Sequence, residues 1–194
     1  GLAERLEREG ENSPADVVLT VDIARLSVYA EKNLFAKIDS DVLNSKIPAH
    51  LRDVEGYWYG LSVRSRIIGA SSERVKPGEI TSYEDLADPK WKGRICSRPG
   101  SHVYNRALVA SMIATHGETK AEAWARGVVA NFARKPQGND RAQAKAIYQN
   151  VCDIAIMNHY YYGKMLTAEQ PEQRDWANAI NIIFANQGDN DRGA

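Results

Sequence analysis

Short apolar runs that are typical of buried strands alternate along this chain with longer segments of helical character. The runs that predict strands are residues 16–20, 58–68, 95–97, 152–157 and 181–185. The segments that predict helices are residues 23–32, 82–86, 103–116, 120–133, 141–149 and a stretch from about Tyr161. Alternation of this kind favours an α/β fold with largely parallel strands, because a crossover between parallel strands usually contains a helix.

The chain has 194 residues, which is enough for one large domain or two small ones. A boundary is expected near residues 61–64, because the portion before it is too small to be stable alone. We assign residues 1–62 to an incomplete portion of a first lobe, residues 63–190 to a second lobe, and residues 191–194 to a tail toward a missing segment. The chain begins without Met and with a pattern typical of the middle of a helix, so we expect a piece of a longer polypeptide.

Composition and motifs argue against several classes of function. Twenty-five basic residues balance twenty-five acidic ones, so no net charge favours nucleic acid or an anionic membrane. No apolar run approaches the ~18–20 residues that span a bilayer. The four His have no zinc-like spacing, and phosphate-binding loops, nucleophile elbows and catalytic triads are not evident. These observations argue against an enzyme.

Three consecutive tyrosines, Tyr160, Tyr161 and Tyr162, follow the predicted strand that ends near residue 157. The chain has nine Tyr but only three Phe, which suggests that some of the hydroxyl groups are used. Ligands of α/β proteins bind at strand ends, and phenolate oxygen suits a hard trivalent cation. Adjacent helical side chains diverge by about 100°, so Tyr160 and Tyr161 are expected to converge at an irregular strand-to-helix junction. Taken alone, the pattern is more typical of an aromatic cluster that covers the sheet end.

Two further stretches contain candidate binding residues. The loop at residues 96–105 is rich in small and hydroxyl side chains, which leaves helix N–H groups free to bind an anion. Tyr104 in the first turn of that helix is placed to share a crevice with Tyr160, or else packs beside a capped helix start. Arg64 lies on an alternating segment, where it is either solvated or directed at the phenols, whose ionised form it would favour.

Cys96 and Cys152 are the only two cysteines, and each lies on or beside a predicted strand. If these strands are neighbours, a disulfide is feasible and would suit an oxidising compartment. The alternative is a pair of buried thiols that act as small apolar side chains.

Several runs, in a consistent order, closely resemble those of the ferric-ion-binding periplasmic proteins, the transferrin-like receptors of bacterial iron ABC importers. The matching runs cover nearly the whole chain and are residues 12–17, 60–66, 83–96, 103–105, 136–140 and 158–161. The run Tyr-Glu-Asp-Leu-Ala-Asp-Pro-Lys-Trp-Lys-Gly also occurs in related binding proteins and marks the fold. Asn-x-Tyr-Tyr together with Val-Tyr-Asn is more specific to iron.

The resemblance implies an α/β fold of the periplasmic binding protein type II class, mostly one lobe with a central mixed sheet flanked by helices. It implies that Tyr160 and Tyr161 are paired phenolate ligands of Fe(3+) and that Tyr104 is an additional one. Asp22 matches an acidic ligand from the other lobe, and Arg64 matches an arginine that balances the phenolate charge.

By the same resemblance, Asn158 and Ser101 help to bind a synergistic anion such as carbonate, whereas Tyr162 is expected to pack. The implied protein is a monomeric, non-enzymatic binding protein, periplasmic or extracytoplasmic and lipid-anchored, that delivers iron to an ABC importer permease. The family begins with a strand and loop that contribute a His or Tyr ligand, and this chain starts after them. It also extends past Ala194, so this chain alone is expected to bind iron weakly, since affinity depends on two lobes closing on the ligand.

Other functions remain open. The same fold serves receptors for oxyanions or small organic solutes, in which the tyrosines would be stacking platforms. An enzyme that uses tyrosine-ligated iron is disfavoured by the lack of catalytic His or Cys near the motif. A purely structural module would make the tyrosines part of the core.

Overall fold

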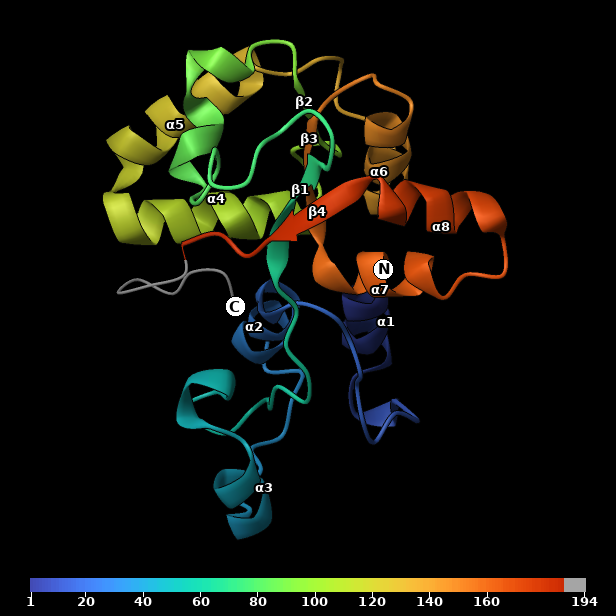
Figure 1. Ribbon diagram of the computed structural model, residues 1–194. Coiled ribbons are helices and arrows are strands. Elements are labelled where there is room, and N and C mark those ends of the chain that lie inside the picture. The colour runs from blue at the N-terminus through green and yellow to red at the C-terminus, as the bar shows by residue number, and fades with distance from the viewer. Residues whose placement is uncertain (187–194) are drawn as a thin grey trace. The chain divides into compact units, whose positions relative to one another are not determined.

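The computed structural model describes residues 1–186, which form two compact units (Figure 1). The smaller unit is Gly1–Val63, and the larger unit begins at Arg64. The predicted tail at residues 191–194 lies outside the described residues, as does the end of the predicted second lobe. Within residues 1–186, the structure contains no helix with the length and apolar character needed to cross a membrane.

The larger unit is built around a four-stranded sheet. Its strands are β1 (Arg66–Ser71), β2 (Ile95–Cys96), β3 (Ile154–Asn158) and β4 (Ile180–Ile183), in the order β2-β3-β1-β4. Strand β2 pairs with β3 in parallel, whereas β1 is antiparallel to both β3 and β4. The mixed sheet is confirmed and the largely parallel pairing is wrong. Alternation of strands and helices predicts the helical crossovers from β2 to β3 and from β3 to β4. It does not predict the direction in which β1 runs in the sheet.

Helices cover both faces of this sheet (Figure 1). They are α4 (Val103–His116), α5 (Glu118–Ala130), α6 (Asp140–Tyr148), α7 (His159–Leu166) and α8 (Pro171–Asn178). Successive side chains of β3 enter different cores, because side chains alternate across a strand. Ile154 and Ile156 pack in the core beneath α4 and α5, and Ala155 and Met157 in the core beneath α6, α7 and α8. Burial on both faces explains why β3 is a continuous apolar run.

Most of the predicted elements of the larger unit are present. Helix α4 has the predicted bounds and ends at Gly117, whose φ of 79° suits a residue without a Cβ atom. The segment predicted as a short helix at residues 82–86 is a 3₁₀ helix, Glu84–Ala87. The strand predicted over residues 58–68 begins only at Arg66, where its first partner, Asn158, ends β3. A strand is stabilised by a paired neighbour, which the segment before Arg66 lacks in this sheet.

The smaller unit contains α1 (Leu2–Glu9), α2 (Ile23–Glu31) and α3 (Asp41–Lys46), of which α2 matches its prediction closely. The strand predicted at residues 16–20 does not form, and its apolar side chains Val17 and Leu19 are 82% and 80% exposed. The prediction is wrong because alternating apolar residues form a strand only where another strand pairs with them, and residues 1–186 supply no such pairing here.

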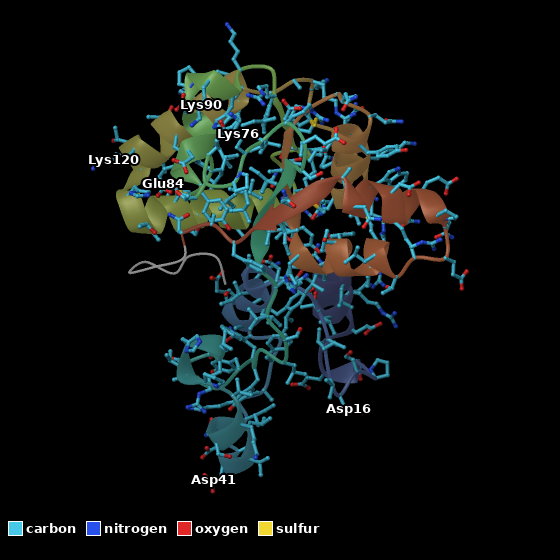
Figure 2. The ribbon with its side chains drawn as sticks, in the orientation of Figure 1. Asp16, Asp41, Lys76, Glu84, Lys90 and Lys120 are labelled. Atoms are coloured by element: carbon cyan, nitrogen blue, oxygen red, sulfur yellow. A yellow bond between two sulfur atoms is a disulfide. The ribbon has the colours of Figure 1, made fainter. Side chains whose placement is uncertain are left out.

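The surface of the larger unit carries charges of both signs. Figure 2 shows Lys76, Glu84, Lys90 and Lys120 on its loops and helices. This mixture agrees with the equal numbers of acidic and basic residues in the chain.

A disulfide and a pair of arginine–aspartate contacts lie beside the start of β3. A disulfide joins Cys96 at the end of β2 to Cys152, and their Cα atoms are 5.9 Å apart. The next residue, Asp153, accepts hydrogen bonds from the Nε atoms of Arg74 and Arg94. Partial burial acts to raise the pKa of the Asp153 carboxyl, but the hydrogen bonds from Arg74 and Arg94 outweigh it and lower the pKa overall.

Asp153→Asn should lower the free energy of unfolding by about 2 kcal/mol at pH 7, the scale of hydrogen bonds to a charged group. Because the folded-state pKa is lowered, the carboxylate stabilises the fold above its unfolded pKa, and this contribution disappears as the pH falls through the folded value. Urea denaturation should therefore show the variant and the wild type converging as the pH falls from about 5 to below 3.8, the ordinary pKa of an Asp carboxyl. A difference that stays constant across this range would contradict the assignment.

Candidate metal centre

Tyr160 and Tyr161 lie in the first turn of α7, immediately after β3 ends at Asn158. Their rings stack with centroids 4.5 Å apart and an interplanar angle of 29°. The expectation that the backbone is irregular at Tyr160 and Tyr161 is wrong, since both residues are helical. Side-chain torsions bring the rings together, because a long phenol can turn away from its Cα–Cβ direction. The junction thus presents two neighbouring phenols on a rigid helix start.

Tyr104 comes from a different element, the first turn of α4, and meets this pair. Its hydroxyl lies 3.3 Å from the hydroxyl of Tyr160. Arg64 Nη1 donates to the same Tyr104 oxygen, also at 3.3 Å. The structure therefore brings together three of the residues selected from the sequence, which are separated by up to 96 positions along the chain (64 to 160).

Cations surround the phenol rings. Those over Tyr104 are Arg64, Arg66 and Arg98, at 5.5, 5.7 and 5.1 Å from the ring centroid. Arg141 lies 5.2 Å from the centroid of Tyr161, and Lys164 Nζ lies 5.8 Å from that of Tyr160. Cations over aromatic faces are attracted by the ring quadrupole, and they also favour a negative charge on the phenol.

The surroundings of the Tyr104 hydroxyl nevertheless favour its protonated form in the metal-free protein. Burial raises the pKa of Tyr104 above its ordinary value of 10.0, and the interaction with Tyr160 raises it further. Arg64 and Arg98 act in the opposite direction without reversing the shift. A bound cation would have to displace this proton, as metal ions do when they bind a weakly acidic ligand.

Sequence reasoning missed the buried polar cluster next to these tyrosines. Asp140, the first residue of α6, is fully buried and binds Arg66 and Arg98. One signal was present for Arg66, which follows Arg64 by two positions and therefore shares its side of an extended segment. Asp140 lay within a run matched to the family, but nothing local indicated that it is buried.

The two expected anion-binding residues differ in their surroundings. Asn158 is buried, and its Oδ1 accepts from Arg66 Nη1 at 3.0 Å. Ser101 is exposed in the loop before α4. One of the N–H groups expected to be free at that helix start, that of Tyr104, donates instead to His102 Nδ1 at 3.2 Å. Helix α7 has no side-chain cap at its start.

The remaining selected residues have other local roles. Asp22, in the smaller unit, is the N-cap of α2 and accepts from the Ala24 N–H at 3.2 Å. Its φ of 80° is uncommon for a residue with a Cβ atom. Tyr162 packs against the core beneath α6, α7 and α8.

Ordinary metal-binding clusters do not explain this arrangement. Among residues 1–186, no group of three or more His, Cys, Asp or Glu side chains is placed to hold a metal ion. Phenol oxygens of Tyr104 and Tyr160 lie together in the larger unit, and the ring of Tyr161 stacks on that of Tyr160. Phenolate is an anionic oxygen ligand that binds ferric iron, as in the haem of catalase.

Comparison with known proteins gives consistent matches. The family described as bacterial extracellular solute-binding protein matches residues 12–188. Iron uptake protein A1 of Synechocystis sp. is 46% identical over 186 residues, which are 96% of this chain and 52% of that protein. The Fe(3+)-binding periplasmic protein of Serratia marcescens is 30% identical over 161 residues, 82% of this chain and 46% of that protein. The chain thus spans about half the length of these curated relatives.

Solved structures agree with the sequence matches. A Trichodesmium protein in complex with iron and citrate ligands has a TM-score of 0.93 and 46% identity, with 96% of this chain and 59% of that chain covered. Ferric iron-binding protein A of Mannheimia haemolytica, in an open conformation, has a TM-score of 0.89 and 49% identity, with 95% and 58% covered. The larger unit and its mixed sheet therefore have the type II periplasmic binding protein fold.

Proposed function

The chain belongs to the bacterial extracellular solute-binding protein family, and on that basis we propose that it binds ferric iron through tyrosine phenolates for delivery to an ABC importer. The observation that carries this proposal is the meeting of Tyr104 and Tyr160 hydroxyls at 3.3 Å, with Tyr161 stacked beside them. Phenols placed together for packing alone would be replaceable by Phe, whereas a hard trivalent cation requires their oxygens. The names of several relatives refer to iron, which supports the same assignment.

Tyr104, Tyr160 and Tyr161 are the proposed ligands from the larger unit. Three phenolates would offset the three charges of Fe(3+), so the ion and these three ligands would be neutral together, before any further anionic ligand is added. Asp22 is the proposed acidic ligand from the smaller unit. Only its Oδ1 is used in capping α2, and the carboxylate has a second oxygen.

The cations near the phenols support a role for an anion in binding. Arg64 donates to Tyr104 and is proposed to balance phenolate charge. The further cations over the rings exceed the single buried carboxylate of Asp140, so the site has positive charge left once the phenolates bind iron. A synergistic anion such as carbonate, held near Ser101, Asn158 and the uncapped start of α7, would meet this excess.

The two units suggest how binding is organised in the whole protein. We propose that the larger unit is a second lobe and that residues 1–62, the range expected from the sequence, belong to a first lobe. Binding proteins of this class close two lobes around their ligand, so ligands outside this chain would complete the site. A monomer that meets the permease of an ABC importer is the proposed working form.

The disulfide supports a location outside the cytoplasm. Disulfides persist in oxidising compartments such as the periplasm and are rare in the cytosol. We therefore propose a periplasmic or lipid-anchored extracytoplasmic protein, in agreement with relatives that are named as periplasmic.

Titration with ferric nitrilotriacetate tests the proposed function. The protein should develop a red-to-purple phenolate charge-transfer band, and at about 100 times the Kd iron should stabilise the fold by about 2.7 kcal/mol. Binding should release protons, because each phenol must lose its proton to bind. Gallium(III) is the matched control, since it should stabilise the fold without visible colour.

A colourless titration without stabilisation would contradict the proposal. Stabilisation by sulfate or citrate in the absence of iron, with no response to ferric iron, would favour a receptor for an oxyanion or a small organic solute instead.

A further inference from the structure

We infer that Asp140 is a positioning residue for ferric binding, an inference that rests on the proposed function. Its side chain joins the segments that carry Tyr104 and Tyr160. It was not among the binding residues selected from the sequence. Its effect would act through Arg66, Arg98 and the backbone of Asn158, the three groups that it binds.

The carboxylate of Asp140 bonds to three separate segments. Its Oδ1 accepts from Arg98 Nη1 at 3.0 Å, in the loop that leads to α4. Its Oδ2 accepts from Arg66 Nη1 at 2.9 Å, at the start of β1. The same Oδ2 accepts from the backbone N–H of Asn158 at 2.8 Å, one residue before α7 begins. One side chain thus links the approach to Tyr104 with the approach to Tyr160.

Arg66 extends this link to the turn that carries Tyr104. Its Nη2 donates to Asn105 Oδ1 at 2.6 Å, and its Nη1 also donates to Asn158 Oδ1. Asn105 Nδ2 in turn donates to Ser97 Oγ and to the Arg98 carbonyl, both at 3.0 Å. The network therefore runs without a break from the end of β3 to the residue that follows Tyr104.

The charged side chains of this network are largely buried, so a lost partner cannot readily be replaced by water. Asp140 has no exposed side-chain area, and the side chains of Arg66 and Arg98 are 10% and 9% exposed. Burial lowers the pKa of Arg66, and the charge of Asp140 acts against that shift. Without the carboxylate, two neighbouring guanidinium groups would lose their shared partner and repel each other. Both groups lie over the Tyr104 ring, so their displacement would move that phenol.

Asp153 is a natural control for this role. It also pairs with two arginines, Arg74 and Arg94, and it lies next to the other end of β3. None of its partners contacts a phenol of the metal centre. Replacing either aspartate removes a carboxylate shared by two arginines, but only Asp140 connects to the tyrosines.

The experiment compares Asp140→Asn and Asp153→Asn in the intact protein, by ferric nitrilotriacetate titration and by urea denaturation. Asp140→Asn should raise the Kd for iron by about 10–100-fold, the usual effect of losing a residue that orients a metal ligand. Its charge-transfer absorbance per bound iron should fall as Tyr104 leaves the site. Asp153→Asn should lose stability and keep the wild-type Kd within about twofold.

Asn105→Ala is the second variant, for the case that Asp140→Asn does not fold. It leaves the Asp140 ion pairs in place and removes the link to the turn of Tyr104, so it should weaken iron binding severalfold. Equal Kd values for the wild type and for whichever of these two variants folds would overturn the inference.

A measurement without iron separates this inference from the proposed function. In the metal-free protein, NMR should show a contact between the Tyr104 and Tyr160 rings that weakens in the variants of Asp140 or Asn105 and persists in Asp153→Asn. If the wild type binds no iron, this contact still decides whether Asp140 positions the tyrosines, while ferric binding itself is refuted. An unchanged contact would overturn the inference whatever the iron titration shows.

Discussion

Replacing Tyr160 and Tyr161 together with phenylalanine should abolish the ferric charge-transfer band and weaken iron binding by more than about 100-fold. This exceeds the 10–100-fold loss typical of residues that only support a ligand, because two of the proposed ligand oxygens are removed. Phenylalanine keeps the stacked rings and the packing of residue 161 against the core beneath α6, α7 and α8, so the fold should be retained. Visible titration and urea denaturation measure the two effects.

Tyr162→Phe is the matched control. Tyr162 is adjacent in sequence but packs against the same core, and it has no assigned role in binding. Its variant should keep the wild-type colour and affinity. If the double variant remains coloured, or if Tyr162→Phe loses the colour, the ligand assignment is wrong.

Removing the disulfide should produce the largest change in stability. Replacing Cys96 and Cys152 with alanine should lower the free energy of unfolding by about 4 kcal/mol, since the bond closes a loop between residues 56 positions apart. The loss is large beside the roughly 5–15 kcal/mol by which whole domains are stable. Urea denaturation of the variant, and of the wild type under reducing conditions, measures it.

The metal centre provides a control for the disulfide variant. Cys96 and Cys152 belong to the apolar core and have no polar contact with the tyrosines, so the folded fraction should still bind ferric iron. A loss of stability below about 1 kcal/mol would mean that the bond adds little to this fold, despite the effect expected from closure of such a loop.

The larger unit was predictable where its signals are local. The run at residues 154–157 is apolar on both sides, and the polar residues after it mark the change to α7. Helix α4 was bounded by its own residues, including the terminating Gly117. Pairing was not predictable in the same way, because the direction of β1 depends on partners 84 to 115 positions later in the chain.

The smaller unit shows the limit of periodicity. Residues 16–20 have the composition of a strand, yet Val17 and Leu19 are exposed and unpaired within the described part of the chain. A strand pattern specifies which faces could be buried, but the pairing that stabilises a strand comes from a distant segment. Helix α2, whose hydrogen bonds are internal, was predictable from its own residues, a few positions later.

In the candidate site, too, residues with local signals were predictable and residues that depend on distant partners were not. Tyr104, Tyr160 and Arg64 were selected from local patterns and a family resemblance, and the structure places the Tyr104 hydroxyl within hydrogen-bond distance of both Tyr160 and Arg64. Asp140 was not selected, since its partners Arg66 and Arg98 are 74 and 42 positions away. Burial of a charged residue becomes visible only when its partners are placed around it.

The most direct test of the ferric site is a crystal structure of the iron-loaded protein, with anomalous diffraction recorded at the iron absorption edge. We predict one iron peak in direct contact with the phenolate oxygens of Tyr104, Tyr160 and Tyr161. An iron peak elsewhere, with these three oxygens not bound to it, would contradict the account.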